Sequence, residues 1–329
     1  MSKNIKRIAV FTSGGDAPGM NAAIRAVVRT ATFHDLHIYG ISRGYEGMIN
    51  GDLKRLETSD VGNIIHRGGT ILKTARSEEF RTKEGRKQAY ESLIAHDIDA
   101  CIAIGGNGTF TGANIFSKEF DIPFIGVPGT IDNDLFGTDY TIGFDTAINT
   151  AVEAVDKIRD TADSHNRLFF VEVMGRNSGF IALNTGIGSG AGSILIPEKH
   201  DQMDGLIEML KKGAKRKKLF SLVIVAEGNE SGGAMDMANA VKEKFDYYDT
   251  KVTIIGHLQR GGSPTCFDRV LASRLGNGAV EALIAAKPQK NVMAGIINNK
   301  LKFTSFKDAI SKEKNVDDDL MRLAEILAL

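Results

Sequence analysis

Short apolar runs alternate with amphipathic stretches along most of the chain. The apolar, β-branched runs predict strands, and the stretches with apolar residues at helical spacing predict helices. The predicted strands are Ile5–Phe11, His37–Ser42, Asp99–Ile104, Ile122–Val127, Leu168–Met174, Ser193–Ile196, Phe220–Ala226 and Val252–Ile255. The predicted helices are Ala22–Thr32, Lys83–Ala95, a stretch from Thr111, Asp145–Ala162, Met203–Ala214 and one within 315–329. This alternation predicts an α/β fold with mostly parallel sheets.

Length and charge narrow the class of protein. The 329 residues exceed the length at which a single core stops growing, so we expect two domains. The chain carries 41 basic and 41 acidic residues, so no net charge attracts nucleic acid or an anionic membrane, and we expect neither as a partner. No apolar stretch is long enough to span a bilayer. Cys101 and Cys266 lack the spacing of a thiol zinc site, and we expect buried, reduced thiols in a cytoplasmic protein.

Two glycine-rich segments each lie between a predicted strand and a predicted helix. The first is Thr12–Asn21, with Gly14 and Gly15, and the second is Gly105–Phe110. Glycines let a backbone approach an anion, and the free N–H groups of a helix start point towards it. Such segments therefore suit phosphate binding, although each alone fits a tight turn equally well.

An acidic segment follows the strand Ile122–Val127. It reads Pro128-Gly129-Thr130-Ile131-Asp132-Asn133-Asp134. Ligands of open α/β sheets bind at the carboxyl ends of strands, where this segment lies. On an extended backbone Asp132 and Asp134 would point to one side and could hold a proton and a metal ion. The alternative is a solvated Asx turn.

Polar residues also follow the later strands. Arg176, Glu227, His257 and Arg260 come after apolar runs and are candidates to face a ligand. Two successive glycine segments and one acidic segment in the first half predict a crevice lined by neighbouring strand ends.

Six motifs together carry a resemblance to a known family. They are Thr12–Arg25, Arg67–Thr70, Pro128–Asp134, Gly137–Ala147, Val171–Arg176 and Gly256–Pro264. In this order they resemble bacterial ATP-dependent 6-phosphofructokinases, and the similarity extends from about Ile5 to Ala286. The resemblance implies transfer of the ATP γ-phosphoryl group to the 1-hydroxyl of fructose 6-phosphate with Mg²⁺, giving fructose 1,6-bisphosphate and ADP in glycolysis.

The resemblance also implies roles for individual residues. Asp132 is similar to the general base, Thr130 to a hydrogen-bonding partner of the reacting groups, Asp134 to an organiser of Mg²⁺, and Arg176 to the cation that steadies the transferring phosphoryl group. The implied ATP-binding residues are Gly15, Arg76, Ser77, Gly106, Asn107, Gly108 and Thr109. The implied sugar-phosphate residues are Thr130, Asp132, Met174, Gly175, Arg176, Glu227, His257 and Arg260. Arg167 and Lys251 match positions that reach a neighbouring subunit's sugar site, which implies a homotetramer.

A few individual positions bear on the choice of phosphoryl donor, on Mg²⁺ binding and on binding of the sugar phosphate. Pyrophosphate-dependent relatives usually carry aspartate at Gly108 and lysine at Gly129, so glycine at both implies ATP. Asn107 stands where the family usually has a metal-contacting aspartate, and we expect weaker Mg²⁺ binding or a lower rate. Lys251 stands where arginine is usual, which replaces a bidentate fork by a point charge.

The resemblance extends in part to regulation. Arg25, Arg29 and Arg159 match residues of an effector site for ADP or phosphoenolpyruvate, whereas Gly192 replaces its acidic residue. Interface ion pairs are the alternative role for these arginines.

Two domains are implied, of Rossmann-like, three-layer architecture with the active site in the cleft between them. The larger, ATP-binding domain would comprise 1–142 and 258–308, and the smaller, fructose 6-phosphate-binding domain 143–257 and 309–329. Gly105–Thr109 alone would also permit another kinase with a glycine phosphate loop. Asn107 leaves open a weakened or regulatory, phosphofructokinase-like sensor subunit.

Overall fold

The computed structural model describes residues 5–162, 167–217 and 220–328. Within them the chain divides into two compact units. Unit 1 comprises Met1–Thr130, Leu135–Thr146 and Arg260–Lys314, and unit 2 comprises Ile131–Asp134, Ala147–Gln259 and Asn315–Leu329. The units group 131–134 with the second half, unlike the domain bounds expected from the sequence. The domain bounds expected from the sequence, and the active-site cleft between the two domains, stay predictions.

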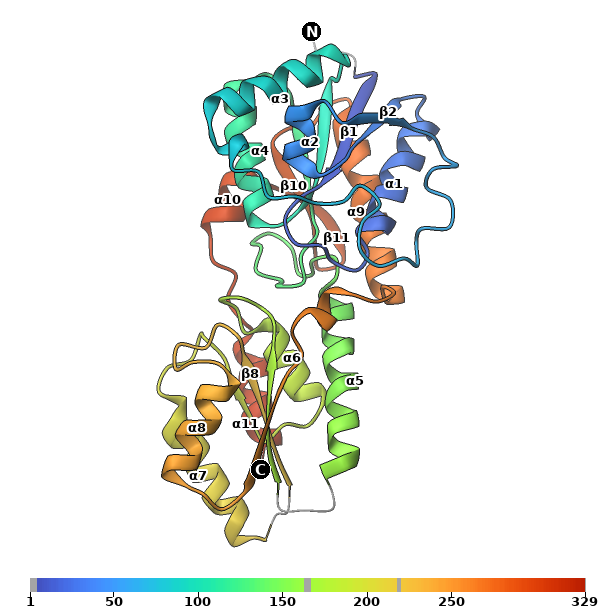
Figure 1. Ribbon diagram of the computed structural model, residues 1–329. Helices are drawn as coiled ribbons and strands as arrows, with labels where there is room; N and C mark the ends of the chain where they lie inside the picture. Colours follow the sequence, from blue (N-terminus) through green and yellow to red (C-terminus); the bar gives the residue numbers. More distant parts are fainter. Residues whose placement is uncertain (1–4, 163–166, 218–219, 329) are drawn as a thin grey trace. The chain divides into compact units, whose positions relative to one another are not determined.

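Unit 1 is built on a seven-stranded sheet of order β11-β10-β5-β4-β1-β2-β3 (Figure 1). Its strands are β1 (Arg7–Thr12), β2 (His37–Ile41), β3 (Leu53–Leu56), β4 (Ala100–Gly105), β5 (Phe124–Pro128), β10 (Val292–Ile297) and β11 (Lys300–Ser305). The five inner strands, β10, β5, β4, β1 and β2, are parallel to one another. The edge strands β3 and β11 pair antiparallel with β2 and β10. β1, β4 and β5 are therefore adjacent and end at the same edge.

Helices cover both faces of this sheet. They are α1 (Met20–Phe33), α2 (Gly44–Asn50), α3 (Lys83–Ala95), α4 (Asn107–Glu119), α9 (Cys266–Ile284) and α10 (Phe306–Ser311), with the 3₁₀ turn η1 (Glu79–Arg81). α1 packs along α9. α2, α3, α4 and α10 cover the other face over an aromatic core that includes Phe11, Phe110, Phe116 and Phe124, all fully buried. This packing fixes α4, which starts directly after β4.

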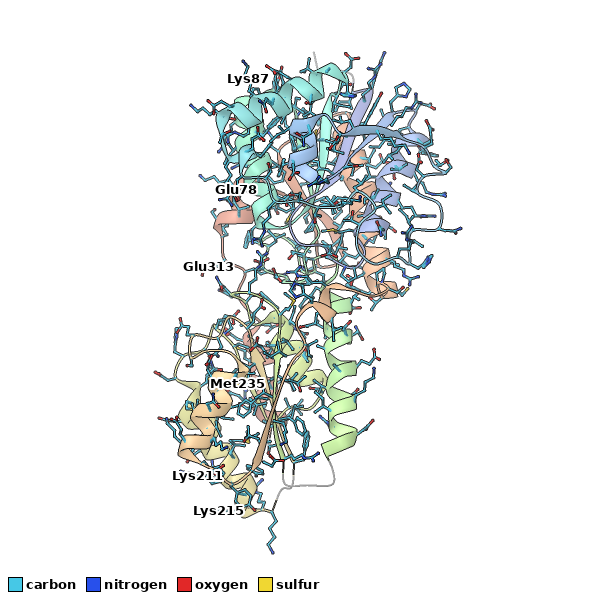
Figure 2. All side chains as sticks on the ribbon, viewed as in Figure 1. Glu78, Lys87, Lys211, Lys215, Met235 and Glu313 are labelled. Carbon is cyan, nitrogen blue, oxygen red and sulfur yellow. The ribbon has the colours of Figure 1, made fainter. Side chains whose placement is uncertain are left out.

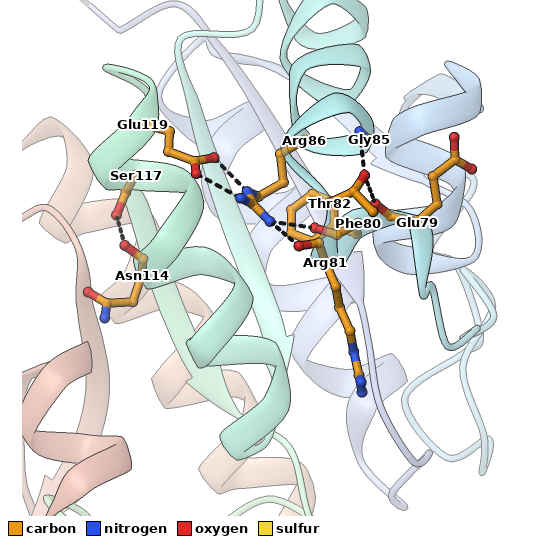
Figure 3. Close-up of polar contacts among 9 residues, drawn as sticks. All are labelled: Glu79, Phe80, Arg81, Thr82, Gly85, Arg86, Asn114, Ser117 and Glu119. Carbon is orange, nitrogen blue, oxygen red and sulfur yellow. Dashed lines mark hydrogen bonds and ion pairs between the residues drawn. The ribbon is translucent and has the colours of Figure 1, made fainter.

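An ion pair between the buried Arg86 and the more exposed Glu119 joins α3 to α4 (Figure 3). The Arg86 guanidinium donates to Glu119 through Nε at 2.5 Å and Nη2 at 2.7 Å. Its Nη1 donates to the carbonyl oxygens of Phe80 and Arg81. Hydrogen bonding to Arg86 lowers the pKa of Glu119 and raises that of Arg86. Because one guanidinium on α3 bonds groups of both η1 and α4, it holds α4 in register with α3.

Unit 2 is built on a parallel sheet of order β7-β8-β6-β9. Its strands are β6 (Arg167–Val173), β7 (Ser193–Leu195), β8 (Phe220–Ala226) and β9 (Asp249–Ile254). α7 (Gln202–Lys215) and α8 (Ala234–Lys244) contribute to one apolar core, and α6 (Phe180–Gly188) and α11 (Asp318–Leu327) pack together. α5 (Phe144–Ala162) begins in unit 1 and continues in unit 2, and the 3₁₀ turn η2 is Gly256–Arg260.

The predicted α/β fold with mostly parallel sheets is confirmed. Cys101 is buried, and burial raises the pKa of its thiol. Cys266 is exposed, so the expectation that both thiols are buried is wrong for it, because it lies in the first turn of α9 at the protein surface. No helix within the described residues combines the length and the apolar character needed to cross a bilayer.

Candidate active site

The carboxyl edge of the unit 1 sheet brings three strand ends together. The Ser13 N–H, after β1, donates to the Ile104 carbonyl of β4 at 3.0 Å. The Gly129 N–H, after β5, donates to the Gly105 carbonyl at 2.9 Å. The strand pairing thus confirms that the first glycine segment, the second glycine segment and the acidic segment start side by side in unit 1.

The second glycine segment lies half inside a helix. α4 begins at Asn107, so the prediction of a start near Thr111 is wrong by about one turn. Gly106 is its N-cap and has no side chain to cap the first N–H groups. The backbone at Asn107, Gly108 and Thr109 therefore presents donors at the positive end of the helix dipole. Such a terminus can bind a phosphate.

Side chains lock this helix start to the first glycine segment. Thr109 Oγ1 donates to the Ser13 carbonyl oxygen at 3.1 Å, and the buried Tyr45 hydroxyl donates to the Thr109 carbonyl oxygen at 2.5 Å. A Cβ on Gly105 would stand 2.6 Å from the Ser13 carbonyl oxygen, so only glycine allows this approach. Thr109 thus holds the start of α4 against the first glycine segment, in addition to its predicted contact with ATP.

The two glycines predicted to select the phosphoryl donor lie in different surroundings. A Cβ on Gly108 would meet nothing within 4 Å, whereas one on Gly129 would stand 3.0 Å from Ile104 and 3.2 Å from Met20. Packing alone therefore favours glycine at position 129. Gly108 is the position whose side chain would enter open space beside the helix start.

Arg260 lies against the first glycine segment. Its Nη1 donates to the Asp16 carbonyl oxygen at 3.2 Å. A Cβ on Gly15 would stand 2.7 Å from Arg260 Nη1. Arg260, expected at the sugar phosphate, and Gly15, expected at ATP, are thus neighbours in unit 1. Arg76 is exposed, and the hydroxyl of Ser77 accepts the Phe80 N–H at the start of η1.

In unit 2, Asp132 is 2% exposed and lies beside Arg176. Arg176 Nε is 3.4 Å from Asp132 Oδ2, and the arginine side chain is 58% exposed. The Ser178 hydroxyl lies 3.0 Å from the Asp132 carbonyl oxygen and 2.9 Å from that of Gly175. The acidic segment and the segment after β6 are therefore joined within unit 2, which brings the predicted base and the predicted phosphoryl-binding cation together.

The backbone between the two aspartates is not extended. Asn133 has a φ of 55°, so the chain turns there, and Asp132 is buried while Asp134 is partly exposed. The expectation that both carboxylates point to one side of an extended strand is wrong, because Asn tolerates the left-handed conformation and turns the chain. Thr130, in unit 1, is 8% exposed, and its carbonyl oxygen accepts the Thr141 hydroxyl at 2.6 Å.

The loop after β6 is held by the end of β8. Glu227 Oε1 accepts the N–H of Arg176 at 2.7 Å and that of Gly175 at 3.3 Å. Arg176 has a φ of 51°, and a Cβ on Gly228 would lie 1.9 Å from its carbonyl oxygen. The close approach requires glycine at 228. Glu227 therefore positions Arg176 through its backbone.

Gln259 fixes Met174 and was not identified from the sequence. Its Oε1 accepts the Met174 N–H at 2.8 Å, and its Nε2 donates to the Ala147 carbonyl oxygen at 3.3 Å. The side chain is fully buried. Its neighbour His257 is exposed on η2. An uncharged residue flanked by candidate ligands gives no signal in the sequence, because its role depends on contacts distant along the chain.

The cations predicted to reach another subunit share one acid. Arg167 and Asp249 are paired across β6 and β9, with Arg167 Nε 3.7 Å from Asp249 Oδ2, and Lys251 Nζ lies 2.8 Å from Asp249 Oδ1. Lys251 is exposed, and β9 is at an edge of the sheet.

The three arginines of the predicted effector site lie on two helices. Arg25 and Arg29 are one turn apart on α1 in unit 1, and Arg159 is in the last turn of α5 in unit 2. Nε and Nη2 of Arg159 are buried and have no hydrogen-bond acceptor among the described residues. Gly192 precedes β7. Lys211 and Lys215 project from the outer face of α7 (Figure 2), and Lys218 lies outside the described residues.

A helix start suited to phosphate at a sheet edge, and a buried carboxylate beside an arginine, are typical of α/β enzymes that transfer phosphoryl groups. The family model that matches is Phosphofructokinase, over residues 7–283. The chain belongs to the phosphofructokinase family.

The relatives are similar over nearly their whole length. The chain is 54% identical to "ATP-dependent 6-phosphofructokinase 2" of Bacteroides thetaiotaomicron over 99% of each chain. It is also 54% identical to "ATP-dependent 6-phosphofructokinase 1" of Thermus thermophilus over 99% of this chain and 100% of the relative.

Solved structures share the fold. Phosphofructokinase from Saccharomyces cerevisiae superimposes with a TM-score of 0.88 at 40% identity over 93% of this chain, which spans only 45% of the yeast chain. Pyrophosphate-dependent phosphofructokinase from Marinobacter aquaeolei superimposes with a TM-score of 0.82 at 25% identity over 98% of this chain and 92% of the relative.

Proposed function

We propose that the chain catalyses ATP-dependent phosphorylation of the 1-hydroxyl of D-fructose 6-phosphate, giving fructose 1,6-bisphosphate and ADP, as a step of glycolysis. Curated relatives named ATP-dependent 6-phosphofructokinase match it at 50–54% identity. The structural observation that carries the proposal is the buried Asp132 beside the exposed guanidinium of Arg176. A sensor subunit would need neither group, and no observation favours that alternative.

Asp132 is the proposed proton acceptor. As the 1-hydroxyl oxygen of the sugar bonds to the γ-phosphorus, its proton passes to the Asp132 carboxylate, and the bond from the γ-phosphorus to the bridging oxygen of ADP breaks. Arg176 neutralises the carboxylate at 3.4 Å in the structure. When the carboxylate is protonated, the guanidinium is available to the phosphoryl oxygens, and Thr130 hydrogen-bonds the reacting groups. Positioning and charge stabilisation supply most of the catalysis in such reactions.

The proposed ATP residues line the carboxyl edge of the unit 1 sheet and the loop after it. The backbone of Gly106, Asn107, Gly108 and Thr109 presents N–H groups at the start of α4, which suit phosphate oxygens. Gly15 lies in the segment that follows β1, and Arg76 and Ser77 add a cation and a hydroxyl. The open space beside Gly108 supports a nucleotide donor.

We propose Asn107 and Asp134 as the residues that assist Mg²⁺. Among the described residues no group of three or more His, Cys, Asp and Glu side chains is arranged to hold a metal ion. This fits a metal that is bound through one or two protein oxygens and mainly through substrate phosphates, as Mg²⁺ commonly is. An amide oxygen at Asn107 and a partly exposed carboxylate at Asp134 suit that mode. When bound, Mg²⁺ neutralises charge on the phosphate oxygens.

The proposed sugar-phosphate residues follow β6, β8 and β9 in the chain. Glu227 uses one oxygen for backbone N–H groups and keeps the other for a sugar hydroxyl, beside Met174 and Gly175. His257 and Arg260 suit the 6-phosphate through charge-assisted hydrogen bonds. Arg167 at the start of β6 and Lys251 on the edge strand β9 would serve a neighbouring subunit's sugar site, so we propose a homotetramer.

Regulation and location complete the proposal. Burial of unsatisfied guanidinium atoms is costly, so Arg159 supports an anion site for ADP or phosphoenolpyruvate, together with Arg25 and Arg29. A kinase of ATP and a sugar phosphate needs the compartment that contains both, and we propose the cytoplasm.

Release of ADP that depends on fructose 6-phosphate tests the reaction. The purified chain is given MgATP or pyrophosphate separately, and ADP or phosphate is followed together with the sugar bisphosphate. We expect turnover with ATP alone. Turnover with pyrophosphate alone would contradict the donor, and no turnover from a folded chain that binds both substrates would contradict the enzyme.

A further inference from the structure

Unit 2 contains a cavity of about 240 Å³ beneath the C-terminal helix α11. Leu183 of α6, Ile194 of β7 and Leu206 of α7 form apolar walls, and Met321 and Ala324 of α11 close it. The cavity exceeds the ~150 Å³ apolar void that takes up a benzene ring. An apolar ligand of that size or larger therefore fits inside the unit.

Small residues create this space. Gly205 of α7 lines the cavity, and a Cβ built on it would meet nothing within 4 Å. Ala324 faces the cavity from α11, where a longer side chain would fill it. Gly205 is exposed and Ala324 is partly exposed, so these short side chains leave the cavity open to the surface.

The mouth of the cavity carries one ion pair between a loop and α11. Lys199, after β7, is ion-paired with Glu325, and their side chains are 52% and 64% exposed. Among the other polar side chains that line the cavity, His200 pairs with Glu230 at 2.8 Å, and Gln202 accepts the Ile196 N–H and donates to its carbonyl oxygen. Asp201 adds a second, exposed carboxylate in addition to that of Glu325. Lys199 is thus the cation at the mouth, and its present partner is a carboxylate of the chain itself.

We propose that this cavity binds an amphiphilic monocarboxylate, whose apolar chain enters the void and whose carboxylate replaces Glu325 on Lys199. The described side chains of α11 include none that is fully buried, so Glu325 can be displaced without opening a core. Arg25, Arg29 and Arg159 are not among the described residues that line the cavity. Gly192, which takes the place of the acidic residue of the predicted effector site, does line the cavity, so the cavity adjoins that position without including the three arginines. The inference does not depend on the proposed reaction.

Calorimetric titration with straight-chain carboxylates from butyrate to octanoate tests the apolar part. Each methylene transferred into the void should tighten binding by about fourfold until the space is filled. An affinity that does not change with chain length, or no heat with octanoate, would overturn the proposal.

Four variants test the position. Gly205→Leu puts a side chain into the void and should abolish octanoate binding, and Ala324→Leu provides a second filling variant in case the first does not fold. Glu325→Gln removes the competing carboxylate and should tighten binding by about threefold, while Lys199→Met should weaken it by a similar factor. Lys211→Met, on the exposed face of α7, is the matched control and should bind like the wild type. Unchanged binding in both folded filling variants would place octanoate elsewhere and reject the cavity.

Discussion

The guanidinium of Arg260 lies against the backbone of Asp16, with Nη1 donating to the Asp16 carbonyl oxygen at 3.2 Å. Gly15 makes this possible, because a Cβ there would stand 2.7 Å from Nη1. A residue expected to bind the sugar 6-phosphate is thus oriented by the segment expected to bind ATP.

Gly15→Ala tests this orientation. The new methyl group should push the flexible guanidinium away and raise KM for fructose 6-phosphate by about tenfold, the value of one charge-assisted hydrogen bond, with a smaller change in KM for ATP. Steady-state kinetics in both substrates measure it. Gly188→Ala is the control, since its Cβ would make an ordinary contact at 3.5 Å. An equal rise in both KM values would show a general distortion instead.

Asp132→Asn removes the proposed proton acceptor and keeps the shape of the side chain. We expect kcat to fall about 10²–10⁴-fold, the usual contribution of a general base. Binding of fructose 6-phosphate, followed by calorimetry, should change little. Ser178→Ala serves as the comparison, because it removes the hydroxyl beside the Asp132 backbone without touching its carboxylate. A kcat for Asp132→Asn within a few-fold of the wild type is incompatible with the assigned role.

Three strands of the unit 1 sheet, the edge strands β3 and β11 and the inner strand β10, were not predicted from the sequence, whereas its other strands and all four strands of the unit 2 sheet were. Parallel strands buried on both faces are unbroken apolar runs, as in β4, and these are easy to recognise. β3 is only four residues long with two adjacent cations, and in β11 lysines alternate with apolar residues, so neither is an unbroken apolar run. α9 was also missed, since it is buried over much of its circumference and has no sustained polar face.

Candidate site residues could be predicted from the sequence where a charged side chain directly follows an apolar strand. Asp132 and Arg176 each follow an apolar run, and the structure brings them together. Gln259 and Asp268 act on groups more than eighty residues away, and no local pattern reveals such a pairing. The turn at Asn133 depends on its left-handed backbone, which the two-residue spacing of the aspartates did not reveal.

Gly108→Asp tests the choice of donor. The side chain would enter open space, so the unfolding free energy should change little. Its negative charge beside the helix start should repel nucleotide phosphates and lower kcat/KM for ATP by about tenfold or more. Gly129→Ala is the contrasting variant: its Cβ is crowded, and overpacking should lower the unfolding free energy in urea by about 1–3 kcal/mol. Unchanged ATP kinetics in Gly108→Asp would remove this position from the donor site.

Asp268 should make stability depend on pH. Its buried carboxylate accepts the N–H groups of Gly143 and Thr146 and the Thr146 hydroxyl. Burial outweighs these bonds and raises its pKa from 3.8 to about 6. The folded chain therefore binds this proton more tightly than the unfolded chain, so the contribution is present below about pH 4 and is lost as the pH rises to about 6.

Asp268→Asn should remove that dependence. In the wild type this group should lower the unfolding free energy by about 3 kcal/mol between pH 4 and pH 7, and urea titrations across this range measure the slope. The variant should be less stable at low pH and have a flatter profile. Asp246→Asn, at an exposed carboxylate, should keep the wild-type slope. A wild-type slope in Asp268→Asn would contradict the assignment.

Asn107→Asp tests the departure from the usual metal-contacting residue. Asn107 is the first residue of α4, where an added negative charge interacts favourably with the helix dipole. We expect the unfolding free energy without ligand to rise by about 0.3–1 kcal/mol. A carboxylate is also a harder, charged ligand for Mg²⁺, so half-maximal activity should require less Mg²⁺. Ser117→Asp, at the other end of α4, is the matched control, because it adds the same charge where the dipole disfavours it. If Asn107→Asp is stabilised but its Mg²⁺ requirement is unchanged, residue 107 does not contact the metal, and its amide serves only the helix start.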